Sequence, residues 1–594
     1  MKDAAFSCAR LLALYDRISD AEDAIPRLRR LVLDLAVRGK LVEQDASDEP
    51  AAELLKRMVS ERNARVKSGQ IRKGKPNDPI DAAPWDAPSG WVWLPLGDTG
   101  NIFIGNSINA VTRERLEKTN AGHPFTATKD VGYGLDPINY DNGLLVSTSD
   151  ESFKVARAQS ILICAEGGSA GRKIGITDRE ICFGNKLLAN ETWSGVSPRY
   201  VLFVYQSSFF YEQFAKQMTG IISGISINKF QQLPFPLPPL AEQRRIVAKV
   251  DELMALCDQL ELARAGREAT RDRLTTASLA RLTAPDTDAE AFESHARFAL
   301  QSLRTLTTRP DQIKTLRQTI LNLAVRGKLV EQEASDEPAA ALQNELRKSK
   351  EDLLKSRTIR NQKVTTTPID AEVTFEIPKL WKWVRLGELV SLLGGYAYKS
   401  ATYVPKEGNQ IIRLGNVKND EVLHYQRPAY ISNEIARQTA DFEILKDDIL
   451  VTMTGTKGKR DFVFTARVKD SDLTQGRLFL NQRVGAIRPF NSDIVPLINL
   501  FLKSDILLDW IFETATGTAN QANIGVSSIL DLPFPLPPLA EQHRIVAKVD
   551  ALMALCDQLE ASLTTTATTR ARLLEALLHE ALEPAVATEM EAAE

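Results

Sequence analysis

The chain has 594 residues, of which 43% are hydrophobic and 25% are charged, and its formal net charge is −3. This length exceeds one ordinary domain, so several folded domains with cores of their own are expected. This slightly negative net charge argues against a basic surface that binds nucleic acid indiscriminately. Local basic patches are still compatible with such a net charge.

The cysteines and the apolar segments exclude two further classes of protein. Five cysteines are scattered without a CxxC pair, which argues against a disulfide framework or a zinc ribbon. No apolar run approaches the roughly 18 residues that would span a bilayer. The first residues, MKDAAFSCARLLALYDRISD, lack the layout of a signal peptide. We therefore expect a cytoplasmic protein that does not contact a membrane.

The first clear element is a helix with a basic segment after it. Residues 25–42, IPRLRRLVLDLAVRGKLV, have helical periodicity, and Gly39 is placed to end the helix. Residues 56–75 then carry eight lysines and arginines against one acid, Glu61, and residues 347–363 form a second basic run. Such runs are usually solvated helix faces or linkers. Because each precedes a variable block, contact with phosphates is the open alternative.

Two variable blocks, residues 85–238 and 375–537, have mixed α and β patterns. Each opens with two tryptophans that lie two positions apart and so share one face of a strand. These tryptophans are Trp91, Trp93, Trp381 and Trp383. Core packing is the favoured interpretation, and stacking on bases is the alternative. Each block closes on LPFPLPPL, where leucine and phenylalanine alternate with prolines, which favours a packed edge strand over a PxxP ligand.

A long helix follows each block. Apolar positions recur at spacings of four, three, four and three, which is a heptad seam. The seam residues are Ile246, Val250, Leu253, Cys257 and Leu260, and then Ile545, Val549, Leu552, Cys556 and Leu559. Pro238, Pro239 and Glu242 suit a helix start. The pattern continues to about Leu282, and about 40 residues make a rod of roughly 60 Å. Two rods packed on each other are expected, with two separate core helices as the alternative.

Three segments occur twice in the same order. They are residues 35–52 and 323–340, residues 233–261 and 532–560, and, as a looser match, residues 90–98 and 380–388. The pair 35–52 and 323–340 differs only where Asp45 stands against Glu333. The pair 233–261 and 532–560 is nearly as close, since it differs at two of 29 positions, where Arg244 stands against His543 and Glu252 against Ala551. The chain is therefore a two-fold duplication of a whole set of domains, and its period is far longer than that of a solenoid repeat. The helical segment 25–60 is itself repeated at 313–348, whereas residues 1–24 show no counterpart.

Each block contains one glycine-rich basic loop directly after a strand. The loops are CAEGGSAGRKIG, after SILICA, and TMTGTKGKRDF, after DILVTM. Glycines let a backbone approach a phosphate closely, and neighbouring cations supply charge. The candidate DNA-binding residues are Gly168, Gly171, Arg172 and Lys173 in the first loop and Gly455, Lys457, Gly458, Lys459 and Arg460 in the second. Neither loop has P-loop spacing, and a plain hairpin turn is the alternative for both.

Motifs of catalysis are absent from the sequence. The five histidines fit neither HExxH nor another metal-ligand spacing, and neither GxSxG nor GxGxxG after a strand occurs. Asp447 and Asp448 are adjacent, so their side chains point to opposite faces of a strand and make a poor acid–base pair. We therefore expect no catalytic centre, no metal site and no cofactor bound by this chain.

The repeated run PLPPLAEQRRIVAKVDELM at 236–254, with its copy at 535–553, resembles the signature of the specificity (S) subunit of Type I restriction–modification systems. The tryptophan-bearing entrance of each block and the strand followed by a glycine-rich basic loop also look like that family. The resemblance covers nearly the whole chain.

The resemblance implies an α+β fold in which two mixed α/β target recognition domains are separated by two long antiparallel coiled-coil helices, as a pseudo-two-fold tandem duplication. Such subunits are not enzymes. Each target recognition domain binds one half of a bipartite, asymmetric site in double-stranded DNA, and the helices act as a ruler for the unread spacer. Two methyltransferase subunits dock on the helical regions, bring S-adenosylmethionine and methylate adenine. Two restriction subunits, which use ATP and magnesium, can join.

The resemblance also sets the expected domains and docking positions. The domains are an N-terminal helical region (1–84), a first target recognition domain (85–240), a central long helix (241–284), a linker with a repeated helical region (285–374), a second target recognition domain (375–539) and a C-terminal long helix (540–594). The expected docking or scaffold positions are Glu242, Gln243, Glu541 and Gln542 together with the seam residues. Two identical partner subunits require two equivalent docking surfaces. Two different half-sites require two different target recognition domains.

Two other classes of function stay open at this point. A single-chain nuclease or methyltransferase would need an acidic metal cluster or a methyl-donor pocket. A duplicated scaffold without a role in DNA reading would need neither, and a gel shift with random duplex in the presence of a methyltransferase partner would separate it from a specificity subunit.

Overall fold

The structure is a computed structural model, and its described residues form two compact units. It describes residues 23–72, 74–134, 136–220, 223–284, 289–369, 375–405, 408–518 and 521–582, together with residues 9, 12, 13, 15, 16, 21 and 373. Unit 1 comprises Met1–Arg267 with Thr566–Glu594, and unit 2 comprises Glu268–Thr565. Each unit contains one of the two variable blocks. Residues 1–8, which include Cys8, and most of the first 24 residues lie outside the described part.

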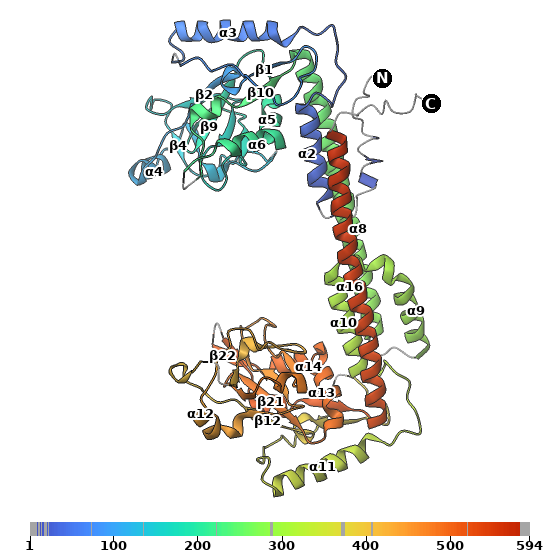
Figure 1. The fold of residues 1–594 in the computed structure, drawn as a ribbon. Coiled ribbons are helices and arrows are strands. Elements are labelled where there is room, and N and C mark those ends of the chain that lie inside the picture. The colour runs from blue at the N-terminus through green and yellow to red at the C-terminus, as the bar shows by residue number, and fades with distance from the viewer. Residues whose placement is uncertain are drawn as a thin grey trace, which may run out of the picture. The chain divides into compact units, whose positions relative to one another are not determined.

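Unit 1 combines its block with helices from three parts of the chain (Figure 1). Its helices are α2 (Ala24–Val37), α3 (Ala51–Lys67), α4 (Ala110–Glu117), α5 (Pro198–Gln206), α6 (Ser208–Gln217) and α7 (Ile227–Gln231), the start of α8 (Leu240–Leu282), and the short 3-10 helices η1 (Leu96–Asp98) and η2 (Thr128–Asp130). Its strands are β1 (Val92–Pro95), β2 (Gly100–Ile104), β3 (His123–Thr126), β4 (Leu145–Val146), β5 (Val155–Ala156), β6 (Ile161–Cys164), β7 (Ile174–Ile176), β8 (Ile181–Phe183), β9 (Leu187–Thr192) and β10 (Pro234–Leu237).

Unit 2 repeats the plan. Its helices are α9 (Ala289–Leu306), α10 (Pro310–Val325), α11 (Ala339–Lys355), α12 (Asn433–Gln438), α13 (Val495–Phe501), α14 (Asp505–Glu513), α15 (Val526–Leu530), the start of α16 (Leu539–Leu582), and the short 3-10 helices η4 (Leu386–Glu388), η5 (Ser400–Thr402), η6 (Leu414–Asn416), η7 (Ala440–Phe442), η8 (Asp470–Leu473) and η9 (Ser492–Ile494). Its strands are β11 (Lys382–Arg385), β12 (Val390–Gly394), β13 (Asn409–Ile412), β14 (Val417–Lys418), β15 (Glu421–Val422), β16 (Glu443–Ile444), β17 (Ile449–Thr452), β18 (Thr454–Gly455), β19 (Thr465–Arg467), β20 (Arg477–Leu480), β21 (Val484–Pro489), β22 (Thr516–Thr518), β23 (Gln521–Asn523) and β24 (Pro533–Leu536).

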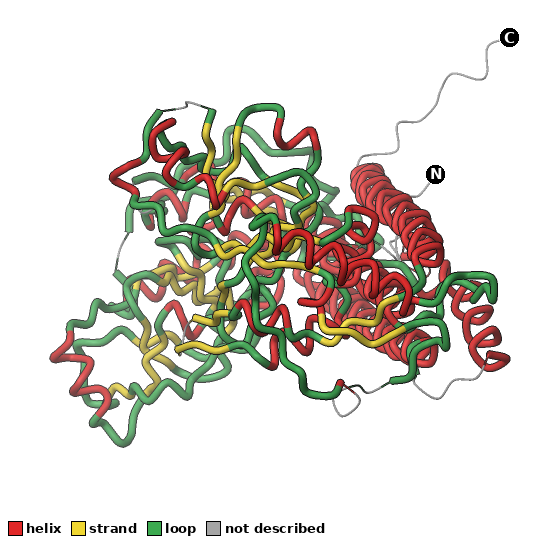
Figure 2. The backbone as a smooth tube through the Cα atoms, turned by 90° about the horizontal axis from the view of Figure 1, so that it is seen from below, coloured by secondary structure: helices red, strands yellow, loops and turns green. Residues whose placement is uncertain are grey.

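The two blocks share their strand topology although their sequences differ. An antiparallel four-stranded sheet has the order β2-β9-β6-β7 in unit 1 and β12-β21-β17-β19 in unit 2. A second sheet pairs β3 with β8 in parallel and β5 with β8 antiparallel, and unit 2 repeats this arrangement with β13, β20 and β16. All these strands lie within the blocks by their residue numbers. Figure 2 shows the strands in yellow among loops and short helices. The duplication therefore extends to the divergent blocks.

The first and the last strand of each block pair with each other. β1 pairs antiparallel with β10, so that Trp93 faces Pro236, and β11 pairs with β24 in the same register, so that Trp383 faces Pro535. The LPFPLPPL segments are thus edge strands that lead into α8 and α16, as predicted. Trp91 and Trp381 are 7% and 6% exposed, which confirms that the entrance tryptophans pack in the core.

The helix predicted over 25–42 is α2, and it ends at the predicted glycine. Gly39 has φ +70°, and Lys40 N–H donates to Leu35 O, which satisfies a carbonyl of the last turn. A Cβ at Gly39 would lie 2.4 Å from Cγ of Pro88. Glycine is therefore required here both by conformation and by space, and Gly327 in unit 2 repeats both conditions.

The long helices fit the predicted length and adopt an antiparallel arrangement. α8 has 43 residues and ends at Leu282, and α16 has 44. Gln44 donates to Glu242 at the start of α8, which places the segment that follows α2 beside this helix start. In the same segment, the Lys40 ammonium donates to Leu582 O at the end of α16. In unit 2, Lys328 donates to Ala284 O, just beyond the end of α8. Each unit therefore pairs the start of one long helix with the end of the other.

The heptad seam has more neighbours than a two-helix rod would give it. Ile246, Val250, Leu253 and Cys257 are fully buried, but in a cluster that also holds α2 and the block helices. The end of α16 contributes Leu574 and Leu577 to this cluster. The seam residues of α8 therefore contact the block and α2 as well as the end of α16. The heptad pattern alone did not indicate the contacts with the block and α2.

One helix lies where the sequence suggested a linker. α9 (Ala289–Leu306) follows α8 and packs Phe292, Ala296 and Ala299 against Leu279 and Leu282 at the end of α8. Within the described part of the chain, no helix is both long enough and apolar enough to cross a membrane.

The glycine that ends α2 provides a stability test. We expect Gly39→Ala to lower the free energy of unfolding by about 1–2 kcal/mol through its left-handed backbone and by about 1–3 kcal/mol more through the clash with Pro88. Gly69 has φ +75°, but a Cβ added there would meet no atom within 4 Å, so Gly69→Ala should cost only the first amount. Urea denaturation followed by circular dichroism measures both, and equal losses would contradict the close contact.

Candidate nucleic-acid interface and the repeated helical joint

The first candidate loop connects β6 and β7, which pair as an antiparallel hairpin. Gly171 has φ +70°, and a Cβ there would lie 2.7 Å from the ring of Phe214 on α6. Arg172 donates from Nε to the Tyr211 hydroxyl at 2.9 Å, and its guanidinium lies 5.3 Å from that ring's centre. Lys173 donates to Thr128 O at 3.1 Å. Both predicted cations are therefore held in place by neighbouring elements, while Gly168 lies in open space.

The second candidate loop presents its cations differently. Lys457 and Lys459 are exposed, and neither side-chain ammonium forms a hydrogen bond or an ion pair with a described residue. Arg460 is held by ion pairs with Asp505 and Asp509 on α14. The Thr456 backbone N–H donates to the Asp461 carboxylate at 2.8 Å, and the hydrogen bonds from Thr456 hold the pKa of that carboxyl below its usual value. The loop is thus tied at its base and carries two unpaired lysines.

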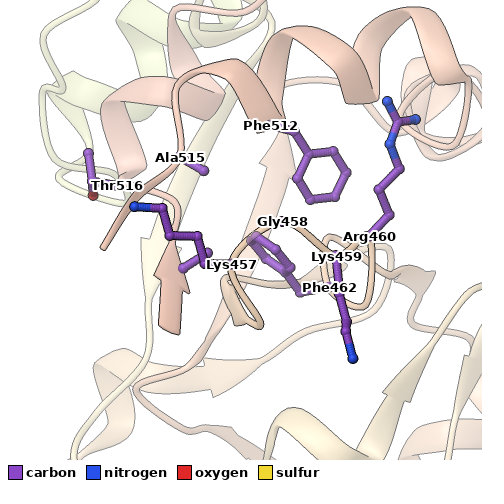
Figure 3. Close-up of a pocket in the computed structure, with 9 residues that line it drawn as sticks. Lys457, Gly458, Lys459, Arg460, Phe462, Phe512, Ala515 and Thr516 are labelled. Carbon is purple, nitrogen blue, oxygen red and sulfur yellow. The ribbon is translucent and has the colours of Figure 1, made fainter. Parts of the chain in front are cut away.

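A pocket of about 350 Å³ lies beside this loop. Its walls include Phe462 and Phe512, whose rings meet edge to face at 5.0 Å. Figure 3 shows the Lys457 and Lys459 side chains extending from the loop in different directions, while Phe512 reaches in from α14. The arrangement combines exposed positive charge with an apolar floor, which suits contact with a phosphate backbone and adjacent bases.

A second hairpin supports each loop, and the sequence reasoning missed it. In unit 2, β18 of the loop pairs with β23, and β23 pairs with β22. In unit 1, Gly224 forms bridges with both Thr219 and Glu166. A Thr-Gly dipeptide begins both hairpins, at Thr219 and at Thr516, and this was the available signal. Each candidate interface therefore consists of two adjoining loops.

Part of each basic run is held by contacts within the chain. On α3, Lys56 pairs with Glu53, Arg62 with Asp98 and Arg65 with Glu61. On α11, Lys350 is half-buried and donates to Gly387 O at 3.0 Å. These contacts favour the interpretation of a helix face that supports the block over one that binds phosphates.

The three repeated segments of unit 1 meet in one cluster, which we call the joint. The Glu242 carboxylate of α8 accepts from Trp91 Nε1 at 2.9 Å and from Gln44 Nε2 at 2.7 Å. One turn on, Arg245 pairs with Asp48 through two hydrogen bonds, at 2.6 and 3.2 Å. These five residues join the long helix, the block entrance and the segment after α2.

Unit 2 contains the same joint. Glu541 accepts from Trp381 Nε1 at 2.8 Å and from Gln332, and Arg544 pairs with Asp336 through two hydrogen bonds. A further repeated contact stands beside each joint: Arg29 pairs with Asp258 and Glu261, and Arg317 pairs with Asp557 and Glu560. The near-identical segments of the sequence are therefore those that contact one another.

Burial raises the pKa of the Glu242 carboxyl, and the hydrogen bonds from Trp91 and Gln44 oppose that rise in part. The same causes raise the pKa of Glu541. A carboxyl that binds its proton more tightly in the folded chain contributes stability when protonated and loses that contribution as pH rises through the folded pKa. The ionised form of Glu242 or Glu541 is therefore stabilised by the hydrogen-bond donors that surround its carboxylate.

Comparison with known proteins identifies the family. A model described as "Type I restriction modification DNA specificity domain" matches residues 88–265 and 378–568. The chain belongs to the Type I restriction–modification DNA specificity family. Each match begins near a block's opening strand and ends within a long helix, so the family domain occurs twice.

Relatives of this family match nearly the whole chain. The EcoAI specificity subunit of Escherichia coli is 31% identical over 572 residues, and the EcoEI specificity subunit of the same organism is 31% identical over 582 residues; each match covers 94% of both chains. A crystal structure of the HsdS subunit from Thermoanaerobacter tengcongensis is 17% identical with a TM-score of 0.42, covering 85% of this chain and 99% of that one. A structure of a type I R-M system assembly gives 16% identity and a TM-score of 0.47, covering 84% and 99%.

Membership of the specificity family confirms the resemblance and the prediction of a recognition subunit in place of an enzyme. The described residues contain no group of histidine, cysteine or acidic side chains that could hold a metal ion. Asp447 lies in a turn with φ +66° and Asp448 directly precedes β17, so the prediction that both stand on a strand is wrong. The two carboxylates nevertheless have separate partners, because Asp447 pairs with Arg467 and Asp448 with Arg488.

The predicted docking positions lie inside this specificity-family scaffold. Glu242, Gln243, Glu541 and Gln542 are at most 1% exposed. Gln243 accepts from Ser197 N–H and donates to Pro238 O, while Gln542 donates to Pro537 O. Their side chains hold the blocks on the long helices, so a partner would have to meet other faces of these helices. The assignment of the candidate DNA-binding residues stays a prediction.

The joint's carboxylate gives a pH-dependent prediction. We expect Trp91→Phe and Trp381→Phe each to cost about 1–3 kcal/mol at neutral pH, because each leaves a buried carboxylate with one donor fewer. Losing the donor raises the pKa of Glu242 or Glu541 further, so the loss should shrink as pH falls and the carboxyl takes up its proton. Urea denaturation at pH 7.5 and at pH 5 measures the difference. Trp383→Phe, whose ring contacts Phe375 and Trp510 and no carboxylate, is the control and should show no such pH dependence.

Proposed function

We propose that this chain is the DNA-reading subunit of a Type I restriction–modification complex, in which each block reads one half of a bipartite, asymmetric site. Membership of the specificity family supports the general role. The finer assignment rests on one observation: the two blocks share a strand topology while the sequences of their exposed loops differ. A common scaffold with unlike loops is what two unlike half-sites require, because sequence is read by side chains at base edges.

The basic loops are the proposed points of contact with the DNA backbone. Lys457 and Lys459 are exposed cations without a described intramolecular partner, and the pocket beside them has aromatic walls. In unit 1, Arg172 is exposed at the corresponding hairpin and is oriented by Tyr211. Charge confined to these loops is compatible with the overall net charge of −3.

The repeated joints support the second part of the proposal. Two identical methyltransferase subunits would dock on the two helical regions, because near-identical segments build a like surface in each unit. Those partners would carry S-adenosylmethionine, and restriction subunits that use ATP and magnesium would join through them. This chain would supply recognition and assembly and no chemistry.

The loop of unit 2 can be tested through salt dependence. In the complex with its methyltransferase partner, the double variant Lys457→Ala/Lys459→Ala should reduce the slope of log affinity against log salt by about 1.8, because each phosphate contact contributes about 0.9. Lys348→Ala/Lys355→Ala on α11 removes the same charge from the basic run and should leave the slope unchanged. A slope that changes only in the α11 variant would move the DNA contact from the loop to the helix.

The division between the blocks can be tested by exchange. Replacing residues 85–238 with the corresponding block of another specificity subunit should change one half of the modified sequence and leave the other half intact. Single-molecule sequencing of methylated DNA reads both halves at once. A change in both halves, or methylation by the purified chain without a partner, would contradict the proposal, and failure of the assembled complex to shift any duplex would favour a scaffold without DNA binding.

A further inference from the structure

Two equivalent arginines of the repeated segment LAVRGKLVEQ stand out because they lack partners. Arg38 and Arg326 are half-buried, and each has a buried Nε that makes no hydrogen bond. Neither guanidinium forms an ion pair with any residue that the structure describes. Burial alone lowers the pKa of Arg326, and no carboxylate counteracts it.

Each of these guanidinium groups lies on an aromatic ring. The Arg38 guanidinium lies 5.3 Å from the centre of the Trp85 ring, and that of Arg326 lies 4.6 Å from the centre of the Phe375 ring. The rings occupy equivalent positions ahead of the block entrance, and although the residue type changes, the aromatic character is kept. Stacking orients the planar fork of an arginine and leaves its outer edge available for a planar acceptor.

The other repeated arginines beside the joints are all paired. Arg245 and Arg544 bond Asp48 and Asp336, and Arg29 and Arg317 bond acids of the long helices. An unpaired, partly buried charge is costly, so its retention in both copies calls for a partner outside the chain. Among the repeated arginines named here, Arg38 and Arg326 are thus the two whose guanidinium forms no ion pair with a described residue.

The nearest acid does not fill the gap. Asp34 lies one turn before Arg38, and burial raises its pKa while the hydrogen bonds from Ser208 and the charge of Arg38 oppose that rise. Its carboxylate accepts from Ser208 N–H at 2.8 Å and forms no ion pair with Arg38. At the equivalent position in unit 2 stands Asn322, which has no charge and whose Oδ1 is buried without a donor. What the two arginines share is therefore the aromatic ring and the open edge.

We propose that Arg38 and Arg326 are equivalent docking contacts, each of which takes a carboxylate of one copy of an identical protein subunit. This inference rests on the proposed function, in which two like methyltransferase subunits bind two like surfaces. Arginines stacked on aromatic rings in partly desolvated surroundings are typical anchors of protein interfaces. The fork of a guanidinium matches a carboxylate through two parallel hydrogen bonds.

The surroundings favour protein over DNA as the occupant. Trp85 packs edge to face on Trp93 and Phe209, with ring centres 4.7 and 4.6 Å apart, so Arg38 stands on an apolar cluster. The candidate DNA loop contacts α6 further along, at Tyr211 and Phe214. Arg38 is connected to α6 through Trp85 and Phe209, whereas the loop contacts Tyr211 and Phe214, two and five residues further along the helix.

The test measures binding of the methyltransferase subunit without DNA. Full-length chain and its Arg38→Met, Arg326→Met and double variants are titrated with purified subunit by calorimetry and native mass spectrometry. Methionine keeps the packing on the ring and removes the charge and the fork. Each single variant should weaken one of two sites by about 10- to 100-fold, and the double variant should weaken both.

Controls separate docking from folding. Arg38→Lys keeps the charge without the fork and should weaken the same site by a smaller factor. Arg113→Met, on α4 of the block, makes the same change of side chain away from the joint and should leave both sites unchanged. Melting curves that match the wild type show that the variants are folded.

Three results would overturn the inference. Equal binding of the subunit by the wild type and the double variant would overturn this inference and leave the proposed function intact. Unchanged subunit binding with a salt slope of DNA binding reduced by about 1 per arginine would assign both residues to phosphates instead. A wild-type chain that binds no methyltransferase subunit would overturn the proposed function and this inference together.

Discussion

The structure depends on one buried interaction that occurs twice: a glutamate of a long helix that accepts hydrogen bonds from a tryptophan and a glutamine. Glu242 joins Trp91 and Gln44, and Glu541 joins Trp381 and Gln332. A buried carboxylate is tolerated only when such donors and a nearby cation compensate its lost hydration. Each of the three parts supplies a group that the other two need. Two of the repeated segments are nearly unchanged between the copies, and the third, at the block entrance, keeps its tryptophans while the blocks diverge.

Local patterns carried much of the fold. The glycine after α2, the prolines before α8 and the heptad positions each act within a few residues, so the helix ends and the closing edge strand followed from the sequence. Long-range pairings did not. Trp91 lies 151 positions from Glu242, and neither segment has a sequence pattern that predicts contact with the other. The counterpart of residues 1–24 was also missed: AFSCAR at 5–10 resembles AFESHAR at 291–297, which lies in α9, and an inserted residue obscures the match.

The candidate interface was predicted less completely than the scaffold, for a related reason. The sequence shows where lysines and arginines lie but not which of them are neutralised by folding. Arg460 looks equivalent to Lys459 in the sequence, yet α14 supplies two aspartates to pair with it. The sequence signalled the supporting hairpins only through their Thr-Gly dipeptides, because backbone pairing with the loops leaves no side-chain pattern. Conversely, the absence of an ion pair at Arg38 and Arg326 became apparent only once the other repeated arginines were known to be paired.

The division of the chain into units has a consequence for biosynthesis. Unit 2 is one continuous stretch, whereas the core of unit 1 includes Leu574 and Leu577, which are synthesised only after the whole of unit 2. The roughly 300 intervening residues take on the order of 15–60 s to translate at about 5–20 residues per second. During that interval the first segment of unit 1 has an incomplete apolar core. Loss of the residues that follow unit 2 would therefore damage the core of the unit whose synthesis begins first.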